Sequence, residues 1–191
     1  MIGYLQRGVG YGSQARERRV AELKTGRLRL VAITPEMLAA EHESDAVGLG
    51  KLLKAKLTHE WPPVDWEPHV YRIISKQYDE WPHSFGWHRY VVLDGGLGRA
   101  RTLVGAIGGF PRAGGDVEIG YSTLPEFQRR GYATACATKM VEFLLGQTGV
   151  ESVSAQSYER VAESIKVMQR CGMRFVGDGD EAGTVRYRRT R

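Results

Sequence analysis

Cysteine is scarce in this chain, with Cys136 and Cys171 the only two among 191 residues. Two cysteines cannot build the disulfide framework of a small secreted domain, and they are too few for a zinc site made of thiolates. Both lie at apolar positions of helical patterns, where a free cysteine behaves as a small hydrophobic residue. The cysteine content therefore predicts a reduced, cytoplasmic setting.

Long hydrophobic runs are also missing, since none approaches the roughly 20 residues that a membrane-spanning helix needs. Residues 1–12 are rich in glycine and lack the apolar segment of a secretory signal. The histidines show no metal-ligand spacing supported by acidic or cysteine partners. We therefore expect neither a membrane anchor nor a bound metal.

The charge balance is basic, with a formal net charge of +5. Arginine gathers near both ends of the chain, at Arg16, Arg18 and Arg19 and again over residues 186–191. No zinc finger or other nucleic-acid signature accompanies this charge. The pattern favours solvated chain ends, with a nucleic-acid partner as the weaker alternative.

A chain of this length is typical of one domain with one hydrophobic core. Residues 1–24 are polar and rich in glycine and arginine, so we expect a flexible extension followed by a single domain over residues 25–191. Residues 28–32 alternate as in a strand, and Thr34 followed by Pro35 predicts a helix start. Leucine spacing predicts a second helical segment over residues 49–57, before Trp61-Pro62-Pro63 interrupts it.

Strands and helices alternate in the rest of the chain. The patterns predict a helix over residues 70–78, and then strands over 90–93, 102–110 and 117–123 that glycine-rich turns join into an antiparallel meander. They next predict a helix over 131–145, a strand over 152–157, a helix over 162–171 and strands over 174–177 and 184–188. This order indicates a mixed α/β fold whose later half contains a β-α-β unit.

The turn before the predicted helix at residue 131 has the composition of a phosphate site. The helix has one apolar stripe, so its N-terminus directs free N–H groups and the positive end of its dipole out of the preceding turn. Gly131 permits close approach of a phosphate, and Arg129 and Arg130 add positive charge. Such an arrangement is suited to a pyrophosphate group.

This segment resembles the acetyl-CoA-binding motif of the GNAT superfamily, Gln/Arg-x-x-Gly-x-Gly/Ala, which Gln128, Gly131 and Ala133 match. Glu118 opens the preceding strand, as a glutamate does in much of the family. Residues 25–38 resemble the opening of the branch that includes the ribosomal-protein N-terminal acetyltransferases, and residues 164–177 resemble the family's last helix-to-strand segment, with Gly172 as helix cap. The resemblance covers about residues 26 to 179.

The resemblance implies a strongly twisted mixed sheet, flanked by helices, that splays open at the cofactor site. The cofactor would be acetyl-CoA, with no metal. Its pantetheine arm would pair with the backbone of Tyr121, Ser122 and Thr123. The backbone N–H groups that follow would hold the diphosphate; these belong to Gln128, Arg129, Arg130, Gly131, Tyr132, Ala133 and Thr134.

Acetyl transfer to an amine needs a neutral nucleophile, a stabilised oxyanion and a proton for the departing thiolate. Glu118 is the candidate general base, with a solvated carboxylate or an ion pair with arginine as the alternative. The backbone N–H near Tyr121 is the candidate oxyanion donor. Val161 and Met168 stand where many family members have an asparagine and a tyrosine acid.

Ser157 and Tyr158 are the substitute proton donors nearest in sequence to the missing tyrosine. We favour Ser157, with a hydroxyl that merely satisfies local backbone as the alternative. A coenzyme A thiol leaves readily enough that no dedicated acid is required.

The acceptor is expected to be a primary amine on a protein N-terminus, a metabolite or an antibiotic. Trp61, Trp66, Trp81, Trp87 and His88 fall in the part of the chain that shapes the acceptor pocket in this family, although such aromatics more often pack in the core. A non-catalytic acyl-CoA-binding module is the alternative function, and a homodimer is plausible for the superfamily.

Overall fold

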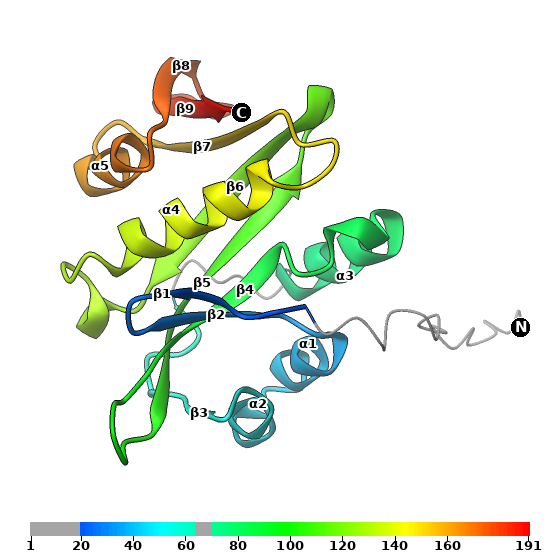
Figure 1. Cartoon of the computed structure of the whole chain (residues 1–191), viewed down its shortest axis with the longest axis vertical. Coiled ribbons are helices and arrows are strands. Elements are labelled where there is room, and N and C mark those ends of the chain that lie inside the picture. The colour runs from blue at the N-terminus through cyan, green and yellow to red at the C-terminus, as the bar shows by residue number, and fades with distance from the viewer. Residues whose placement is uncertain (1–19, 64–69) are drawn as a thin grey trace, which may run out of the picture.

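The computed structural model describes residues 20–63 and 70–191. Within these residues nine strands form one sheet in the order β1-β2-β4-β5-β6-β7-β9-β8, and β3 pairs with β5 beside this path (Figure 1). The strands are β1 (Leu23–Thr25), β2 (Leu28–Ala32), β3 (Ala55–Lys56), β4 (His88–Leu93), β5 (Arg101–Pro111), β6 (Asp116–Thr123), β7 (Ser152–Tyr158), β8 (Arg174–Asp178) and β9 (Thr184–Thr190).

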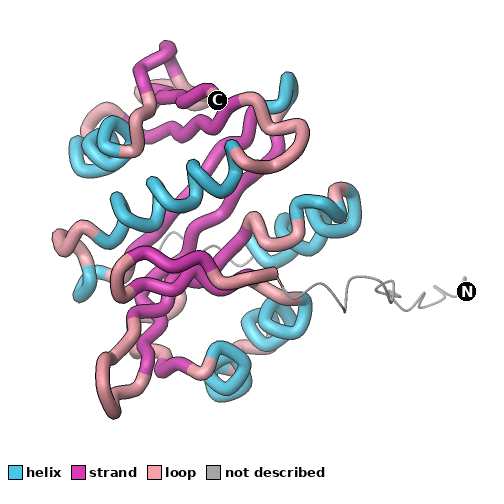
Figure 2. The backbone as a smooth tube through the Cα atoms, in the orientation of Figure 1, coloured by secondary structure: helices cyan, strands magenta, loops and turns pink. Residues whose placement is uncertain are grey.

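The described part of the chain also forms five α-helices. They lie on the two faces of the sheet (Figure 2). They are α1 (Pro35–His42), α2 (Ala46–Leu53), α3 (Val70–Glu80), α4 (Tyr132–Leu145) and α5 (Ala162–Arg170). Residues of α4 and α5 share one buried cluster with Val91, Ile107 and Val153. Residues of α1, α2 and α3 share the other with Tyr90 and Val92. The mixed α/β prediction is confirmed.

Local sequence explains the start of α1 and the end of α5. The Thr34 hydroxyl accepts a hydrogen bond from the Met37 N–H and caps α1, as predicted. Gly172 follows α5 with a φ of +78°, and Met173 behind it is buried. The left-handed glycine followed by an apolar contact is the helix ending that the sequence indicated.

The predicted helix over residues 49–57 is wrong in its second half. Helix α2 ends at Leu53 because Lys54 adopts a left-handed conformation with a φ of +51°. Ala55 and Lys56 then pair in parallel with Arg101 and Thr102 of β5. The leucine spacing continues to Leu57 because Leu57 packs against the same buried cluster as Leu49 and Leu53 of α2. Leu57 does so from a loop and not from the helix.

The first strand lies partly inside the segment that we expected to be a flexible extension. Leu23 and Lys24 pair with Leu30 and Arg29 in an antiparallel hairpin that turns at Gly26. Residues 1–19 lie outside the described residues, as do Trp66 and His69.

The meander of β4, β5 and β6 is antiparallel, as predicted. Strand β6 then runs parallel to β7, and α4 provides the crossover between them. This β6-α4-β7 unit contains the segment that carries the sequence motif.

Candidate functional site

The sheet opens between β6 and β7. Within the described residues, β6 pairs with β7 only from Asp116 to Glu118, whereas it pairs with β5 from Val117 to Thr123. Beyond this point β7 continues beside β9 instead. The β7-facing edge of residues 119–123 therefore has backbone groups that no strand of the described sheet occupies.

The open edge leads directly into the turn before α4. A short 3-10 turn, Pro125–Phe127, is followed by Arg129 with a φ of +60° and Gly131 with a φ of +78°. Two side chains brace the turn, since the Gln128 amide donates to the Thr123 carbonyl (2.9 Å) and Arg130 donates to the Glu126 carbonyl (2.8 Å).

The N-terminus of α4 carries no side-chain cap, because Gly131 occupies the N-cap position. The first N–H groups of an α-helix have no partner within the helix, and the macrodipole makes this end positive. Gly131 is exposed, and a Cβ placed on it would meet no atom within 4 Å. The turn therefore leaves open space and free donors where an anion can bind.

Tyr121 joins the two sides of the opening. Its hydroxyl lies 3.1 Å from the Ser164 hydroxyl and 3.3 Å from the Ser164 carbonyl oxygen, at the start of α5. Burial raises the pKa of Tyr121 to about 12, so the phenol stays protonated near neutral pH. The Tyr121 side chain therefore connects β6 to α5, and its backbone lies in the stretch of β6 that is not paired with β7.

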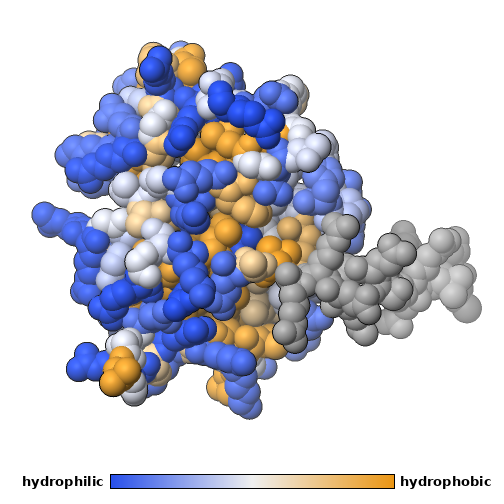
Figure 3. All heavy atoms as spheres, in the orientation of Figure 1, coloured by the Kyte–Doolittle hydropathy of each residue, from blue (hydrophilic) through white to orange (hydrophobic). Residues whose placement is uncertain are grey.

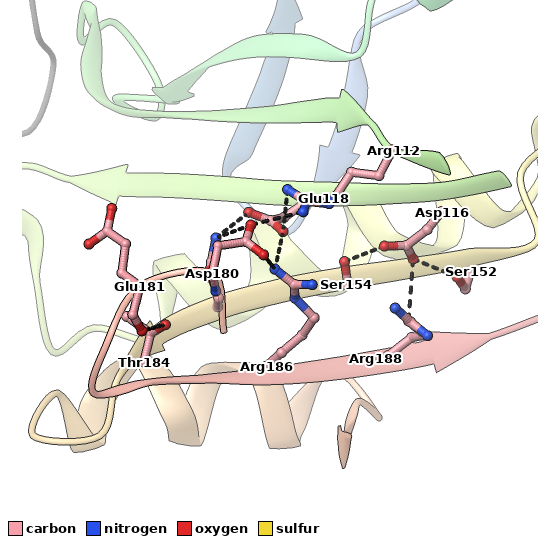
Figure 4. Close-up of polar contacts among 11 residues, drawn as sticks. Arg112, Asp116, Glu118, Ser152, Ser154, Asp180, Glu181, Thr184, Arg186 and Arg188 are labelled. Carbon is pink, nitrogen blue, oxygen red and sulfur yellow. Dashed lines mark hydrogen bonds and ion pairs between the residues drawn. The ribbon is translucent and has the colours of Figure 1, made fainter. Parts of the chain in front are cut away.

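Glu118 sits in a network of opposite charges at the base of the opening (Figure 4). Its carboxylate accepts a hydrogen bond from the Gln156 amide (2.9 Å) and lies 3.3 Å from the Arg112 guanidinium and 3.4 Å from that of Arg186. Asp180, in the β8–β9 loop, pairs with the same two arginines at 2.8 and 2.7 Å. The ion-paired alternative for Glu118 is thus what the structure contains.

The two carboxylate oxygens of Glu118 differ in their hydrogen bonding. Its Oε1 accepts from Gln156, whereas Oε2 is buried and accepts no hydrogen bond from the described residues. The ion pairs to Oε2 are longer than a well-formed charge-assisted hydrogen bond, which measures about 2.7–2.9 Å. Oε2 is therefore enclosed and lies between the guanidinium groups of Arg112 and Arg186.

The arginines at the C-terminal end are not a solvated tail, and that prediction is wrong for β9. Arg186 pairs with Glu118 and Asp180, Arg188 lies 3.6 Å from the buried Asp116, and Arg189 donates to the Cys171 carbonyl. Composition alone could not identify these contacts, because the acidic partners come from distant strands and loops.

Asp116 is a buried carboxylate that the sequence reading missed. It accepts hydrogen bonds from the hydroxyls of Ser152 and Ser154 on β7, the second at 2.6 Å. These bonds lie at the three residue pairs that join β6 to β7. Asp116 therefore holds the closed part of the junction together.

The sheet separates the two predicted proton-transfer residues. Side chains alternate between faces along a strand. Ser157 shares a face with Val153 and Ala155, which pack in the cluster beneath α4, whereas Gln156 reaches Glu118 from the opposite face. Ser157 and Glu118 therefore lie on opposite faces of the sheet.

Val161 and Met168 stand at the positions of the family's asparagine and tyrosine, and both have structural roles in this chain. Met168 is buried in the cluster beneath α4 and α5, and Val161 precedes α5 without capping it. Tyr158, the other substitute donor, gives its hydroxyl hydrogen to Glu181 (2.7 Å). Neither Val161 nor Met168 has a polar side chain that could serve as an acid.

A cavity of about 490 Å³ lies between α1, α2 and the segment before residue 63. Its walls include Glu41, Asp45, Trp61 and Tyr71, and none of the described residues that line it is lysine or arginine. The Trp61 ring lies 5.6 Å from that of Tyr90, and its indole N–H donates to Glu41 (2.8 Å).

This cavity lies on the Glu118 face of the sheet, close to β6. Tyr90 on β4 pairs with Ala106 on β5, and Ala106 pairs with Ser122 on β6. Residues paired across strands lie on the same face, so Tyr90 is on the face of Ser122 and Glu118. Two strand spacings of roughly 5 Å each separate Tyr90 from β6. Glu60, beside Trp61, also contacts the Glu126 N–H (3.4 Å). A larger hollow of about 650 Å³ lies between α2 and the start of β5, and the described residues that line it include none from β6 or β7.

His88 and Trp87 are core residues, and Trp81 is 44% exposed on the surface. Burial lowers the pKa of His88 to about 3, so its imidazole is neutral. The Gln77 amide donates to the Gly109 carbonyl, so the Gln77 oxygen is left to accept from His88 Nε2 (3.0 Å). No helix in the part of the chain that the structure describes could cross a membrane. Residues 20–63 and 70–191 contain no group of three or more histidine, cysteine or acidic residues arranged for a metal.

Comparisons with known proteins agree with this geometry. An uncharacterized N-acetyltransferase of Bacillus subtilis, YjdG, is 27% identical over 155 residues, which are 78% of this chain and 88% of that protein. A solved ribosomal L7/L12 alpha-N-protein acetyltransferase, RimL, in complex with coenzyme A is 13% identical, with a TM-score of 0.58 over 89% of this chain and 98% of that one.

A solved microcin C7 self-immunity acetyltransferase, MccE, in complex with acetyl-CoA and AMP is 16% identical, with a TM-score of 0.56 over 87% of this chain and 94% of its own. These structures share the fold. Residues 27–174 match the acetyltransferase (GNAT) domain family, which is more than half of the chain. The chain therefore belongs to the GNAT acetyltransferase family and is an acyltransferase.

Proposed function

We propose that this enzyme transfers an acetyl group from acetyl-CoA to a primary amine. The observation that carries the proposal is the unpaired edge of β6 leading into the uncapped N-terminus of α4. An extended arm with amide groups fits the first part, and a diphosphate fits the second. The family assignment favours this enzymatic function over a module that only binds acyl-CoA.

The pantetheine arm and the diphosphate of acetyl-CoA would bind to two successive segments of the chain. The backbone of Tyr121, Ser122 and Thr123 would pair with the pantetheine amides. The N–H groups of residues 128–134 would hold the diphosphate. The thioester then lies near Glu118 to Tyr121, at the closed end of the opening.

The reaction would proceed by attack of the neutral amine nitrogen on the acetyl carbonyl carbon. The backbone N–H near Tyr121 stabilises the oxyanion. Glu118 accepts the amine proton, directly or by way of a water. The C–S bond then breaks, and the thiolate of coenzyme A takes a proton from Ser157 or from solvent.

The cavity beside Trp61 would hold the body of the acceptor. Its volume is in the range of small-molecule sites, and apolar and aromatic walls with a few polar groups are typical of such sites. Glu41 and Asp45 are acidic, and none of the described lining residues is lysine or arginine. A cationic amine on a partly apolar body fits this lining better than an acidic one.

Titration calorimetry with acetyl-CoA tests the cofactor site. The native protein should bind, and an Arg130→Glu, Gly131→Asp double variant should bind at least about tenfold more weakly. The matched control is Gly98→Asp with Arg99→Glu, which makes the same two changes in the exposed β4–β5 loop, where Gly98 also has a positive φ of +71°. Absence of binding by the native protein would overturn the proposal.

Thiol release with an amine panel tests catalysis and the acceptor class. Glu118→Gln should lower kcat by about a hundredfold and leave the acetyl-CoA affinity unchanged. Glu41→Gln keeps an acceptor for the Trp61 N–H and should raise KM for cationic amines. A KM that stays the same for every amine would exclude the cavity as the acceptor site and leave the cofactor site standing.

A further inference from the structure

The β8–β9 loop brings a second carboxylate close to Glu118. Asp180 in this loop pairs with Arg112 and Arg186, the same two arginines that face Glu118 (Figure 4). The Asp180 side chain is 45% exposed, whereas that of Glu118 is 16% exposed. On the face that Figure 3 shows, hydrophilic side chains surround the end of the molecule where Figure 1 places β8 and β9. Asp180 is thus the outer, and Glu118 the inner, of two carboxylates that share both cations.

Both arginines bind Asp180 more closely than they bind Glu118. Their distances to Asp180 are 2.8 and 2.7 Å, within the range of charge-assisted hydrogen bonds, whereas those to Glu118 are 3.3 and 3.4 Å. The hydrogen bond from Arg186, together with the charge of Arg112, lowers the pKa of Asp180, so this carboxyl group is ionised near neutral pH. The donors that point at Asp180 are not available to Glu118.

The loop is fixed to β7 through the side-chain amide of Gln156. The Asp180 N–H donates to Gln156 Oε1 (2.8 Å), and Gln156 Nε2 donates to Glu118 Oε1 (2.9 Å). Gly179 permits this close approach, because a Cβ at that position would clash with the Thr184 hydroxyl and with Gln156 Oε1. One side chain therefore contacts both the loop and Glu118, and the fold determines where Asp180 lies relative to Glu118.

The charges around Glu118 balance only when Asp180 is included. Arg112 and Arg186 carry two positive charges, and the ionised Glu118 and Asp180 carry two negative charges. An opposite charge nearby favours the ionised form of a carboxyl group and so makes it a weaker base. Without Asp180, both guanidinium groups could turn fully toward Glu118.

Other charged groups on this face do not replace Asp180. Asp116 and Arg188 face each other at 3.6 Å, and Glu181 in the same loop accepts a hydrogen bond from Tyr158. On the β5 side, Glu118 is paired with Phe110, which is uncharged. Asp180 is therefore the carboxylate that offsets Arg112 and Arg186.

We propose that Asp180 is a positioning residue that keeps Glu118 able to accept a proton, by offsetting the two arginines that orient it. This inference rests on the proposed role of Glu118 as the general base. When Glu118 takes up a proton, the network changes from neutral to one positive charge. Without Asp180 the same step would change it from one positive charge to two, which costs more free energy.

The first test follows the carboxyl carbon of Glu118 by NMR during a pH titration, with the signal assigned by its loss in Glu118→Gln. Asp180→Asn keeps the size of the side chain and should lower the midpoint of the Glu118 titration by about one pH unit. The matched control is Asp178→Asn, which removes the same charge from an exposed residue of β8. It should shift the midpoint by less than about 0.3 units, because water and salt screen that charge.

The second test measures amine acetylation. Asp180→Asn should lower kcat/KM for the amine at least about threefold, because a weaker base accepts the proton less readily. In the Glu118→Gln background the same change should alter kcat/KM by less than about twofold, since no base remains to be affected. A role of Asp180 in the loop structure alone would lower kcat/KM in both backgrounds. Circular dichroism melting checks that each variant is folded.

Two results would overturn the inference: an unchanged titration midpoint in Asp180→Asn, or an equal loss of kcat/KM in both backgrounds. A lowered midpoint with an unchanged kcat/KM has a different meaning. It would support the effect of Asp180 on Glu118 and would show that Glu118 is not the base, so that the proposed mechanism fails at that residue.

Discussion

Arg186 on β9 reaches across β7 to place its guanidinium 3.4 Å from the Glu118 carboxylate on β6. The Arg186 side chain is only 15% exposed and also pairs with Asp180 at 2.7 Å. It therefore links three segments of the chain at the point where the sheet opens. This contact makes Arg186 a positioning residue for the proposed base.

Replacement of Arg186 should impair catalysis more than cofactor binding. We expect Arg186→Met to lower kcat/KM for the amine about tenfold, because Glu118 loses one of the two cations that orient it. Arg186→Lys keeps the charge and should recover part of this loss. The acetyl-CoA affinity by calorimetry should not change in either variant. Unchanged kcat/KM in Arg186→Met would show that Glu118 needs no such orientation.

His88 should make the enzyme less stable as the pH falls. Its folded-state pKa is lowered by burial from 6.5 to about 3, so between these values the unfolded chain binds one more proton than the folded one. Unfolding is therefore favoured as pH falls through 6.5, by about 1.4 kcal/mol for each further pH unit.

Urea unfolding at pH 6.5 and pH 5 measures this effect. The native protein should lose about 2 kcal/mol over this interval from His88 alone. His88→Gln should lack that loss, whereas His83→Gln, which changes an exposed histidine, should keep it. Equal pH dependence in both variants would contradict the neutral buried imidazole.

Gly131→Ala should separate backbone strain from binding. Its φ of +78° costs a residue with a Cβ about 1–2 kcal/mol, and no atom lies within 4 Å to add a clash. Stability should fall by about that amount, measured by urea unfolding. Acetyl-CoA binding should weaken further, since a methyl group would stand among the N–H donors. A variant that is destabilised yet binds normally would place the diphosphate elsewhere.

The contact between Tyr121 and Ser164 should contribute measurably to stability. A double-mutant cycle with Tyr121→Phe and Ser164→Ala should give a coupling energy of about 0.5–1.5 kcal/mol, the net worth of a hydrogen bond. Each variant should remain folded because the ring and the helix stay in place. A coupling energy near zero would mean that the hydroxyls do not tie β6 to α5 in solution.

Local patterns predicted most of the fold. The strand runs of β4, β5 and β6 with the glycine-rich turns between them, the apolar stripe of α4 and the caps at Thr34 and Gly172 each depend on a few neighbouring residues. The motif at Gln128, Gly131 and Ala133 identified the turn before α4 in the same way. Such features depend on neighbours along the chain, so sequence reasoning can find them.

Features that depend on distant contacts were missed. Lys54 ends α2 in a left-handed conformation that its residue type does not indicate. Leu57 lies at helical spacing from Leu53, so the sequence predicted a longer helix than the structure contains. The partners of Glu118 come from the β5–β6 turn, β7 and β9. Charge composition assigned Arg186 to a solvated end, because nothing local shows that an acidic side chain two strands away will meet it.

The placement of Glu118 and Ser157 on opposite faces has a consequence for proton balance. If both act as proposed, the proton that leaves the amine and the proton that reaches the sulfur travel on different sides of the sheet, and neither residue can hand its proton to the other. In each turnover Glu118 would then have to lose its proton to solvent, and Ser157 would have to regain one from solvent, by separate routes. A change in solvent access on one face should slow the proton exchange of the residue on that face and leave that of the other residue unaffected.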